Sequence, residues 1–131
     1  MGNKPFVLVV DDDPDLVEAV AMKLESEGFR VAKAYNGNQA WEEIKKEKPA
    51  LTVLDVMMPE KDGYQVCDEI KRDADYRDIT VILLTAVGSE VPTSTYTHRQ
   101  GRTTLADEYL PKPVDLDELV KLVREYTEEG S

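Results

Sequence analysis

The chain has 131 residues, with 16 Lys or Arg against 27 Asp or Glu, and its formal net charge is −11. This length suits one domain, residues 1–131, and the acidic balance argues against direct binding to nucleic acid or to a membrane surface. One Cys and one His exclude a disulfide framework and a Cys/His zinc site.

Strand-like and helix-like patterns alternate along the chain. In chain order, apolar runs at 6–10, 30–35, 51–54, 80–84 and 107–110 predict five strands. Apolar residues recur at helical spacing after the first, second, third and fifth runs: Leu16, Val17, Val20 and Leu24; Ala40, Trp41 and Ile44; Val66, Cys67 and Ile70; and Leu116, Leu119, Val120 and Val123. Strands that alternate with helices predict a parallel sheet with helices on both faces.

The polarity of the runs predicts the order of the strands. The runs at 6–10, 51–54 and 80–84 are almost continuously apolar, as is typical of central strands buried on both faces. The runs at 30–35 and 107–110 are more polar and suit the edges of the sheet. We therefore expect the order 2-1-3-4-5, in which a crevice opens at the carboxyl ends of strands 1 and 3.

Three consecutive aspartates follow the first strand, in the segment "FVLVVDDDPDLVEAV". Asp13 before Pro14 is typical of a helix N-cap, because a carboxylate accepts N–H groups of the first turn and proline suits the first helical position. Asp11 and Asp12 are adjacent carboxylates at the end of a buried strand, where they repel one another unless a cation or a proton intervenes. That electrostatic cost indicates a function.

Other strands deliver polar residues to the same rim of the sheet. Asp55 ends the third strand, Thr85 ends the fourth, and Lys112 follows the fifth. Because the carboxyl ends of parallel strands share one edge, we expect these side chains to lie near Asp11 and Asp12. The second strand delivers only "YNG", which is typical of a turn.

Four segments, "VVDDDPD", "LDVMMPEKDGYQ", "ILLTA" and "EYLPKPVD", resemble the receiver domain of bacterial two-component response regulators, in order and over essentially the whole chain. The resemblance implies a flavodoxin-like (βα)5 doubly wound α/β fold. It also implies a phosphorylation-dependent switch that accepts a phosphoryl group from a sensor histidine kinase or a histidine phosphotransfer protein. Such a receiver assists its own phosphotransfer and slow dephosphorylation, but it is not an enzyme with a separate substrate.

The resemblance assigns roles to the acidic residues at the rim. Asp55 matches the phosphoacceptor, which forms an aspartyl phosphate. Asp12 matches a direct Mg²⁺ ligand and Asp11 a ligand that acts largely through water. Asp55 and the backbone carbonyl of Met57 complete the implied set, in which Mn²⁺ is able to substitute for Mg²⁺.

The same resemblance assigns roles to four further residues. Lys112 matches the lysine that pairs with Asp55 and later with the phosphoryl group, and Pro113 after it implies a cis peptide bond. Thr85 matches a hydroxyl that moves to bond the phosphoryl group. Tyr109 matches an aromatic side chain whose rotamer follows that movement.

The connection between the fourth and fifth strands departs from the family pattern. Residues 86–111 look longer than usual, and their Gly, Pro, Ser and Thr content predicts an atypical fourth helix. Met57 and Val87 occupy the positions best placed to hold a hydrolytic water, and neither side chain can hydrogen-bond as an amide or carboxylate does. The resemblance thus implies a long-lived phosphorylated state.

Other protein classes fit the sequence less well. A haloacid-dehalogenase-type phosphatase needs a second Asp where this chain has Met57, and a flavin binder needs a phosphate loop where it has carboxylates. An EF-hand fails because Leu16 stands where that loop needs Gly. The serious alternative is a receiver-like module that binds partners without phosphorylation, which would be marked by a missing pocket residue.

The cellular setting follows in outline. We expect a cytoplasmic protein, since no segment is apolar enough to cross a membrane and no secretory signal begins the chain. The partners implied are a kinase or phosphotransfer protein and an unidentified downstream protein, with a monomer or a phosphorylation-dependent dimer. The chain resembles a stand-alone receiver of the chemotaxis or sporulation type, while a receiver excised from a longer regulator or hybrid kinase stays open.

Overall fold

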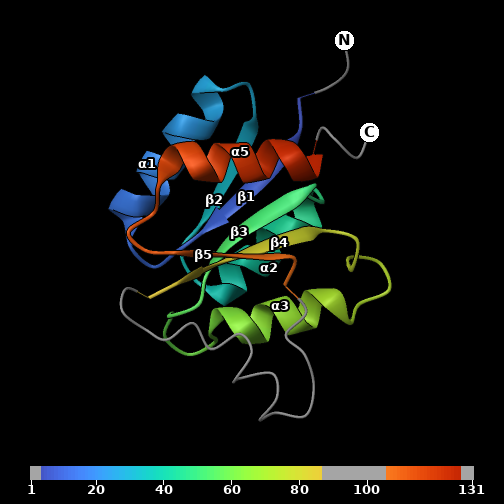
Figure 1. Ribbon diagram of the computed structural model, residues 1–131. Helices are drawn as coiled ribbons and strands as arrows, with labels where there is room; N and C mark the ends of the chain where they lie inside the picture. Colours follow the sequence, from blue (N-terminus) through green and yellow to red (C-terminus); the bar gives the residue numbers. More distant parts are fainter. Residues whose placement is uncertain (1–3, 87–105, 128–131) are drawn as a thin grey trace.

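The computed structural model describes residues 4–86 and 106–127. Within these ranges the strands form one parallel sheet, made of β1 (Phe6–Val10), β2 (Arg30–Ala34), β3 (Leu51–Asp55), β4 (Thr80–Thr85) and β5 (Glu108–Pro111) (Figure 1). The helices described are α1 (Pro14–Ser26), α2 (Gly37–Lys46), α3 (Gly63–Lys71) and α5 (Leu116–Thr127). None of them is long and apolar enough to span a membrane.

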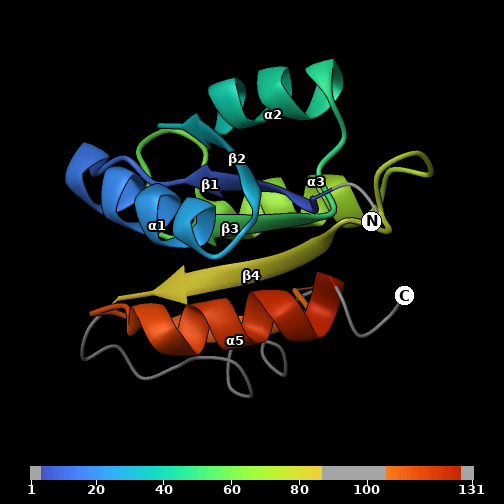
Figure 2. The same ribbon diagram turned by 90° about the horizontal axis from the view of Figure 1, so that it is seen from above.

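The strand order is β2-β1-β3-β4-β5, as the sequence predicts. Figure 2 shows β2, β1, β3 and β4 in this spatial order. Every residue of β3 is buried, whereas β2 at one edge has a single buried residue. The structure therefore has the flavodoxin-like doubly wound topology, with its more polar strands at the edges.

Two hydrophobic layers cover the sheet, and alternate residues of each strand point into different layers. Val7 and Val9 of β1 pack with α1 and α5 on one face. Leu8 and Val10 pack with α2 and α3 on the other face, where Cys67 is a fully buried core residue (Figure 1). The helices on opposite faces thus hold the sheet rigid beneath the residues at its carboxyl rim.

Short acidic or amide side chains begin the first three helices. The Asp13 carboxylate accepts the N–H groups of Asp15 and Leu16, at 3.0 and 3.4 Å, which confirms the predicted N-cap of α1. Asn36 caps α2, although the sequence indicated only a turn there, and Asp62 caps α3. These caps satisfy N–H groups that the helices cannot pair internally.

Lys71 connects α3 to the amino-terminal rim of the sheet, at the starts of β4 and β5. Its ammonium donates to the carbonyls of Arg77 and Ile79, at 3.2 and 2.6 Å, and lies 2.9 Å from Asp107 Oδ2. Asp107 Oδ2 also accepts the N–H of Val81 at 2.8 Å. This largely buried ammonium therefore fastens α3 to the starts of β4 and β5.

The segment 87–105 lies outside the described residues. It contains the predicted atypical fourth helix and Val87, one of the two positions assigned to the lifetime of the phosphorylated state. Those expectations stay predictions.

Candidate functional site

Four strands bring polar side chains to the carboxyl rim, as expected. Asp11 follows β1, Asp55 ends β3 and Thr85 ends β4, and all three are at most 2% exposed. Lys112 follows β5, and its N–H donates to the carbonyl of Thr85 at 2.8 Å. The regular sheet therefore holds these residues at fixed positions around one point.

The Lys112 ammonium lies between two buried carboxylates. Its Nζ is 3.1 Å from Asp11 Oδ2 and 3.1 Å from Asp55 Oδ1. The Lys112–Pro113 peptide bond is cis, as the resemblance implied. One positive charge faces two negative ones, so the buried group carries an excess negative charge when all three are ionised.

Backbone N–H groups fix one oxygen of each buried carboxylate. The N–H of Asp13 donates to Asp11 Oδ1 at 2.9 Å, and the N–H of Met57 donates to Asp55 Oδ1 at 3.3 Å. Asp55 Oδ2 and Thr85 Oγ1, both buried, have no hydrogen-bond partner among the described residues. Buried polar atoms are almost always paired, so unpaired atoms at the carboxyl ends of two strands suit contact with a ligand.

The site shifts the ionisation of its members. Burial, and then the negative charge of Asp11, raises the pKa of Asp55 from 3.8 to about 6. Burial also raises the pKa of Asp11. Burial lowers the pKa of Lys112, but its contacts with Asp55 and Asp11 outweigh this and hold the pKa above its ordinary value.

The donor set fits a hard divalent cation. One carboxylate oxygen from each of Asp11, Asp12 and Asp55 lies within 4.8 Å of the others, and Asp12 is exposed at the mouth of the site. Asp55 Oδ2 has no hydrogen-bond partner in the described part of the chain. Clustered carboxylate oxygens are ligands that Mg²⁺ prefers, so these residues suit the ion that the sequence implied.

Two other predicted residues are not among these three carboxylates. Met57 is next to Asp55 in the loop after β3, and its side chain is 63% exposed. Tyr109 is partly buried against the hydrophobic layer on the α2 and α3 face. The register pairs Leu83 with Tyr109 and Thr85 with Pro111, so Thr85 and Tyr109 belong to the same face of the sheet.

Gly63 contributes to the site, although sequence reasoning did not single it out. A Cβ at this position would lie 2.8 Å from the Cα of Val56 and still closer to the backbone oxygen of Asp55. The N–H of Gly63 donates to the carbonyl of Val56 at 3.0 Å. In the sequence, only the "DG" in "LDVMMPEKDGYQ" could have indicated a special role for Gly63. That role depends on how closely α3 approaches β3, which the sequence does not show.

A family model for the response regulator receiver domain matches residues 7–124. The chain belongs to this family. The receiver is 40% identical over 125 residues to the response regulator Rre1 of Synechocystis sp. (strain ATCC 27184 / PCC 6803 / Kazusa), with 95% of this chain and 52% of the relative covered. It is 37% identical to the same organism's DNA-binding dual master transcriptional regulator RpaA, with 92% and 48% covered. The receiver thus spans about half the length of these curated relatives.

Solved structures give the same assignment for the fold. The Francisella response regulator 1452 receiver domain superimposes with a TM-score of 0.83 at 27% identity, covering 98% of this chain and all of that one. A putative response regulator from Chloroflexus aurantiacus J-10-fl gives a TM-score of 0.82 at 29% identity, with 95% and 98% covered. The receiver therefore shares the flavodoxin-like architecture of response regulators in two-component systems.

Proposed function

We propose that this receiver is a phosphorylation-dependent switch and that Asp55 is its phosphoacceptor. The observation that carries the proposal is the buried Asp55 carboxylate, with one oxygen held by Lys112 and by the N–H of Met57 and the other without a hydrogen-bond partner in the described residues. An anchored carboxylate beside a fixed positive charge suits nucleophilic attack on phosphorus.

Phosphoryl transfer to Asp55 requires only the phosphohistidine donor and a proton from solvent. A carboxylate oxygen of Asp55 forms a bond to the phosphorus of a phosphohistidine, and the phosphorus–nitrogen bond breaks. Its electron pair returns to the imidazole nitrogen of the donor, which takes a proton from solvent. Lys112 keeps a positive charge beside the new acyl phosphate, and the Thr85 hydroxyl is available to donate to a phosphoryl oxygen.

We propose Asp11, Asp12, Asp55 and the backbone carbonyl of Met57 as the residues that would hold Mg²⁺, or Mn²⁺ in its place. Bound Mg²⁺ would offset the repulsion among the carboxylates and neutralise charge on the phosphoryl oxygens. Among the three carboxylates, Asp12 is the exposed one, so it suits direct contact with an ion that arrives from solvent.

The partners follow from this chemistry. A sensor histidine kinase or a histidine phosphotransfer protein supplies the phosphoryl group, and a downstream protein surface or module reads the switch through Thr85, Tyr109 and the 86–111 connection. The relative RpaA is named as a DNA-binding regulator. This chain's charge of −11 disfavours DNA contact by the receiver itself, which supports an output carried elsewhere.

Intact-mass measurement tests the acceptor. With acetyl phosphate or a phosphohistidine donor and Mg²⁺, the wild-type protein should gain about 80 Da, the mass of one phosphoryl group, and Asp55→Asn should gain nothing. Asp75→Asn is a matched control. Asp75 is an exposed aspartate between α3 and β4, away from the carboxyl rim, and its replacement should leave the adduct unchanged. An adduct that persists on the Asn variant would assign the acceptor to another residue.

A further inference from the structure

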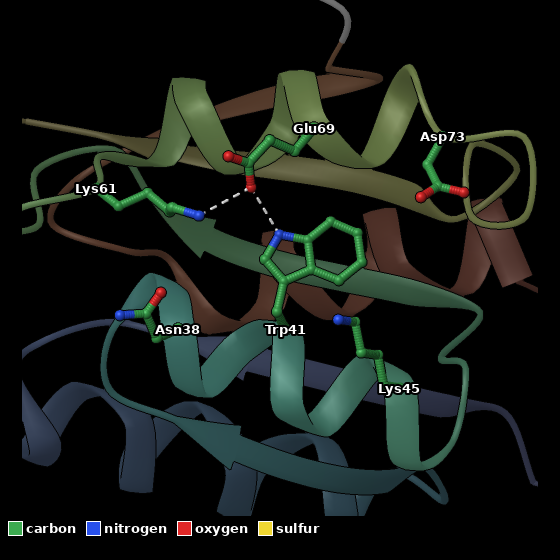
Figure 3. A pocket seen from close by; sticks show the side chains of 6 residues that line it. All are labelled: Asn38, Trp41, Lys45, Lys61, Glu69 and Asp73. Atoms are coloured by element: carbon green, nitrogen blue, oxygen red, sulfur yellow. Dashed lines mark hydrogen bonds and ion pairs between the residues drawn. The ribbon is translucent and has the colours of Figure 1, made fainter.

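A pocket lies between α2 and α3. We define the acceptor loop as residues 56–62, between β3 and α3. The pocket has a volume of about 400 Å³, and its lining consists of Asn38, Trp41, Lys45, Lys61, Glu69 and Asp73 (Figure 3). Lys61 comes from the acceptor loop, Trp41 from α2 and Glu69 from α3, so the pocket joins three elements.

One carboxylate oxygen connects these three elements. Glu69 Oε1 accepts a hydrogen bond from Trp41 Nε1 at 2.7 Å and lies 3.1 Å from Lys61 Nζ (Figure 3). Because both donors share one acceptor, a movement of Lys61 alters the hydrogen bond of the indole. Trp41 is the only tryptophan in the sequence, so tryptophan fluorescence comes from this pocket alone.

The side chain of Lys61 is held along its length as well as at its end. A Cβ added to Gly37, the first residue of α2, would lie 2.8 Å from Lys61 Cδ and 3.2 Å from Lys61 Cβ. The aliphatic stem therefore rests on the first turn of α2 before the ammonium reaches Glu69. This packing limits the positions that the acceptor loop can take relative to both helices.

The acceptor loop is short and tightly hydrogen-bonded. The N–H of Lys61 donates to the carbonyl of Pro59 at 2.7 Å, and the N–H of Met58 donates to that of Val56 at 3.2 Å. At the start of the loop the Met57 N–H holds Asp55 Oδ1, and the Met57 carbonyl is a proposed metal ligand. These hydrogen bonds and the shortness of the loop favour transmission of a displacement at Met57 to Lys61.

We propose that Lys61 is a positioning residue for the acceptor loop, and that its link through Glu69 couples the Asp55 site to Trp41. The coupling is reciprocal: an ion or phosphoryl mimic at Asp55 changes the surroundings of Trp41, and loss of the Lys61–Glu69 pair weakens ion binding. The inference rests on the proposed function, because it takes Asp55 and Met57 as the place where Mg²⁺ binds.

Titration of the full chain with Mg²⁺, and then with beryllofluoride as a phosphoryl mimic, tests the coupling. Tryptophan fluorescence should change with the midpoint that calorimetry gives for Mg²⁺. Lys61→Met keeps the stem and removes the charge, and it should weaken Mg²⁺ binding about threefold, within the range carried by packed networks, and reduce the fluorescence response. Lys61→Arg, which can still pair with Glu69, should restore both.

Lys45→Met is the matched control. The Lys45 ammonium lies 5.8 Å from the centre of the Trp41 ring, in the same pocket but on α2 and not on the acceptor loop. This variant should shift the resting fluorescence and leave the Mg²⁺ midpoint unchanged. In a double-mutant cycle, Glu69→Gln should add little to the loss caused by Lys61→Met, because both remove the same contact.

The outcomes separate this inference from the proposed function. Wild-type Mg²⁺ affinity in a folded Lys61→Met protein, or an equal loss in Lys45→Met, would overturn the positioning role while Asp55 still gains its phosphoryl adduct. A wild-type protein that binds Mg²⁺ by calorimetry without any fluorescence change would overturn the coupling to Trp41. A protein that neither binds Mg²⁺ nor becomes phosphorylated would overturn the proposed function and this inference together.

Discussion

Lys112 faces two buried carboxylates, and one ammonium cannot neutralise both. Burial, and then the charge of Asp11, raises the pKa of Asp55 to about 6, and the buried Asp55 Oδ2 and Thr85 Oγ1 lack hydrogen-bond partners in the described residues. An unpaired buried polar atom costs about 1–3 kcal/mol. Such costs are typical of functional sites, because a group already satisfied by the protein has little to offer a ligand.

The raised pKa of Asp55 predicts a stability effect that depends on pH. The folded protein binds the proton of the Asp55 carboxyl group more tightly than the unfolded chain does. The ionised carboxylate therefore destabilises the fold, fully above about pH 6 and not at all below the ordinary pKa of 3.8. In EDTA at about pH 7.5, Asp55→Asn should raise the free energy of unfolding by an amount on the order of 2 kcal/mol. Urea denaturation should show a smaller increase in the free energy of unfolding at about pH 5. An increase that grows on acidification would contradict the raised pKa of Asp55 as its cause.

The sequence predicts which residues meet at the rim, because strand periodicity places Asp55, Thr85 and Lys112 at the same ends of parallel strands. It does not predict Gly63 or Lys61. Their contacts depend on the path of the acceptor loop and on the distance between α3 and β3, which no local pattern encodes.

At the scale of elements, hydrophobic periodicity predicts the existence and type of each strand and helix described, and strand ends differ by at most about one residue. Apolar side chains decide which segments enter the core, whereas the last residue of an element depends on hydrogen bonds to its neighbours. Asp13 was predicted as a cap because Pro14 marks the helix start. Asn36 and Asp62 lack that mark, and their capping role emerges only from the structure.

The approach of α3 to β3 predicts unequal effects for two glycine substitutions. In Gly63→Ala the added methyl group meets backbone atoms of Asp55 and Val56, which cannot give way, so the variant should lose about 1–3 kcal/mol of stability and phosphorylate more slowly. In Gly37→Ala the added methyl group meets only side-chain atoms of Lys61 and Val66, which can shift more easily than backbone, and the loss should stay below about 1 kcal/mol. Urea denaturation and the rate of adduct formation compare the two, and equal losses would refute the difference in packing.

At the scale of the whole molecule, two partly or largely buried lysines stand at opposite rims of the sheet. Lys71, 12% exposed, pairs with two carbonyls and with Asp107 at the amino-terminal rim. Lys112, 24% exposed, pairs with Asp11 and Asp55 at the carboxyl rim. The first is surrounded by fixed partners, whereas the second shares its carboxylates with a proposed cation.

Mg²⁺ should affect the stability of a Lys71 variant and of a Lys112 variant differently. Lys71→Met removes the ammonium from Asp107 and from two carbonyls, so it should cost on the order of 2 kcal/mol with or without Mg²⁺. Lys112→Met should also destabilise the metal-free protein, but saturating Mg²⁺ should restore part of the loss, because a cation then offsets the charges of Asp11 and Asp55. Thermal unfolding with EDTA and with Mg²⁺ measures both, and equal rescue of the two variants would contradict this division.

The ammonium of Lys71 at the amino-terminal rim has a consequence for how the sequence tolerates change. A library selected only for folded protein should reject replacements of Lys71 and Asp107, because every partner there serves the sheet. The same selection should accept, and even enrich, neutral residues at Asp55, where the wild-type charge works against folding. A selection for signalling should reverse the preference at the carboxyl rim and leave the amino-terminal rim as it was. The two ends of one sheet would thus record two different selective pressures.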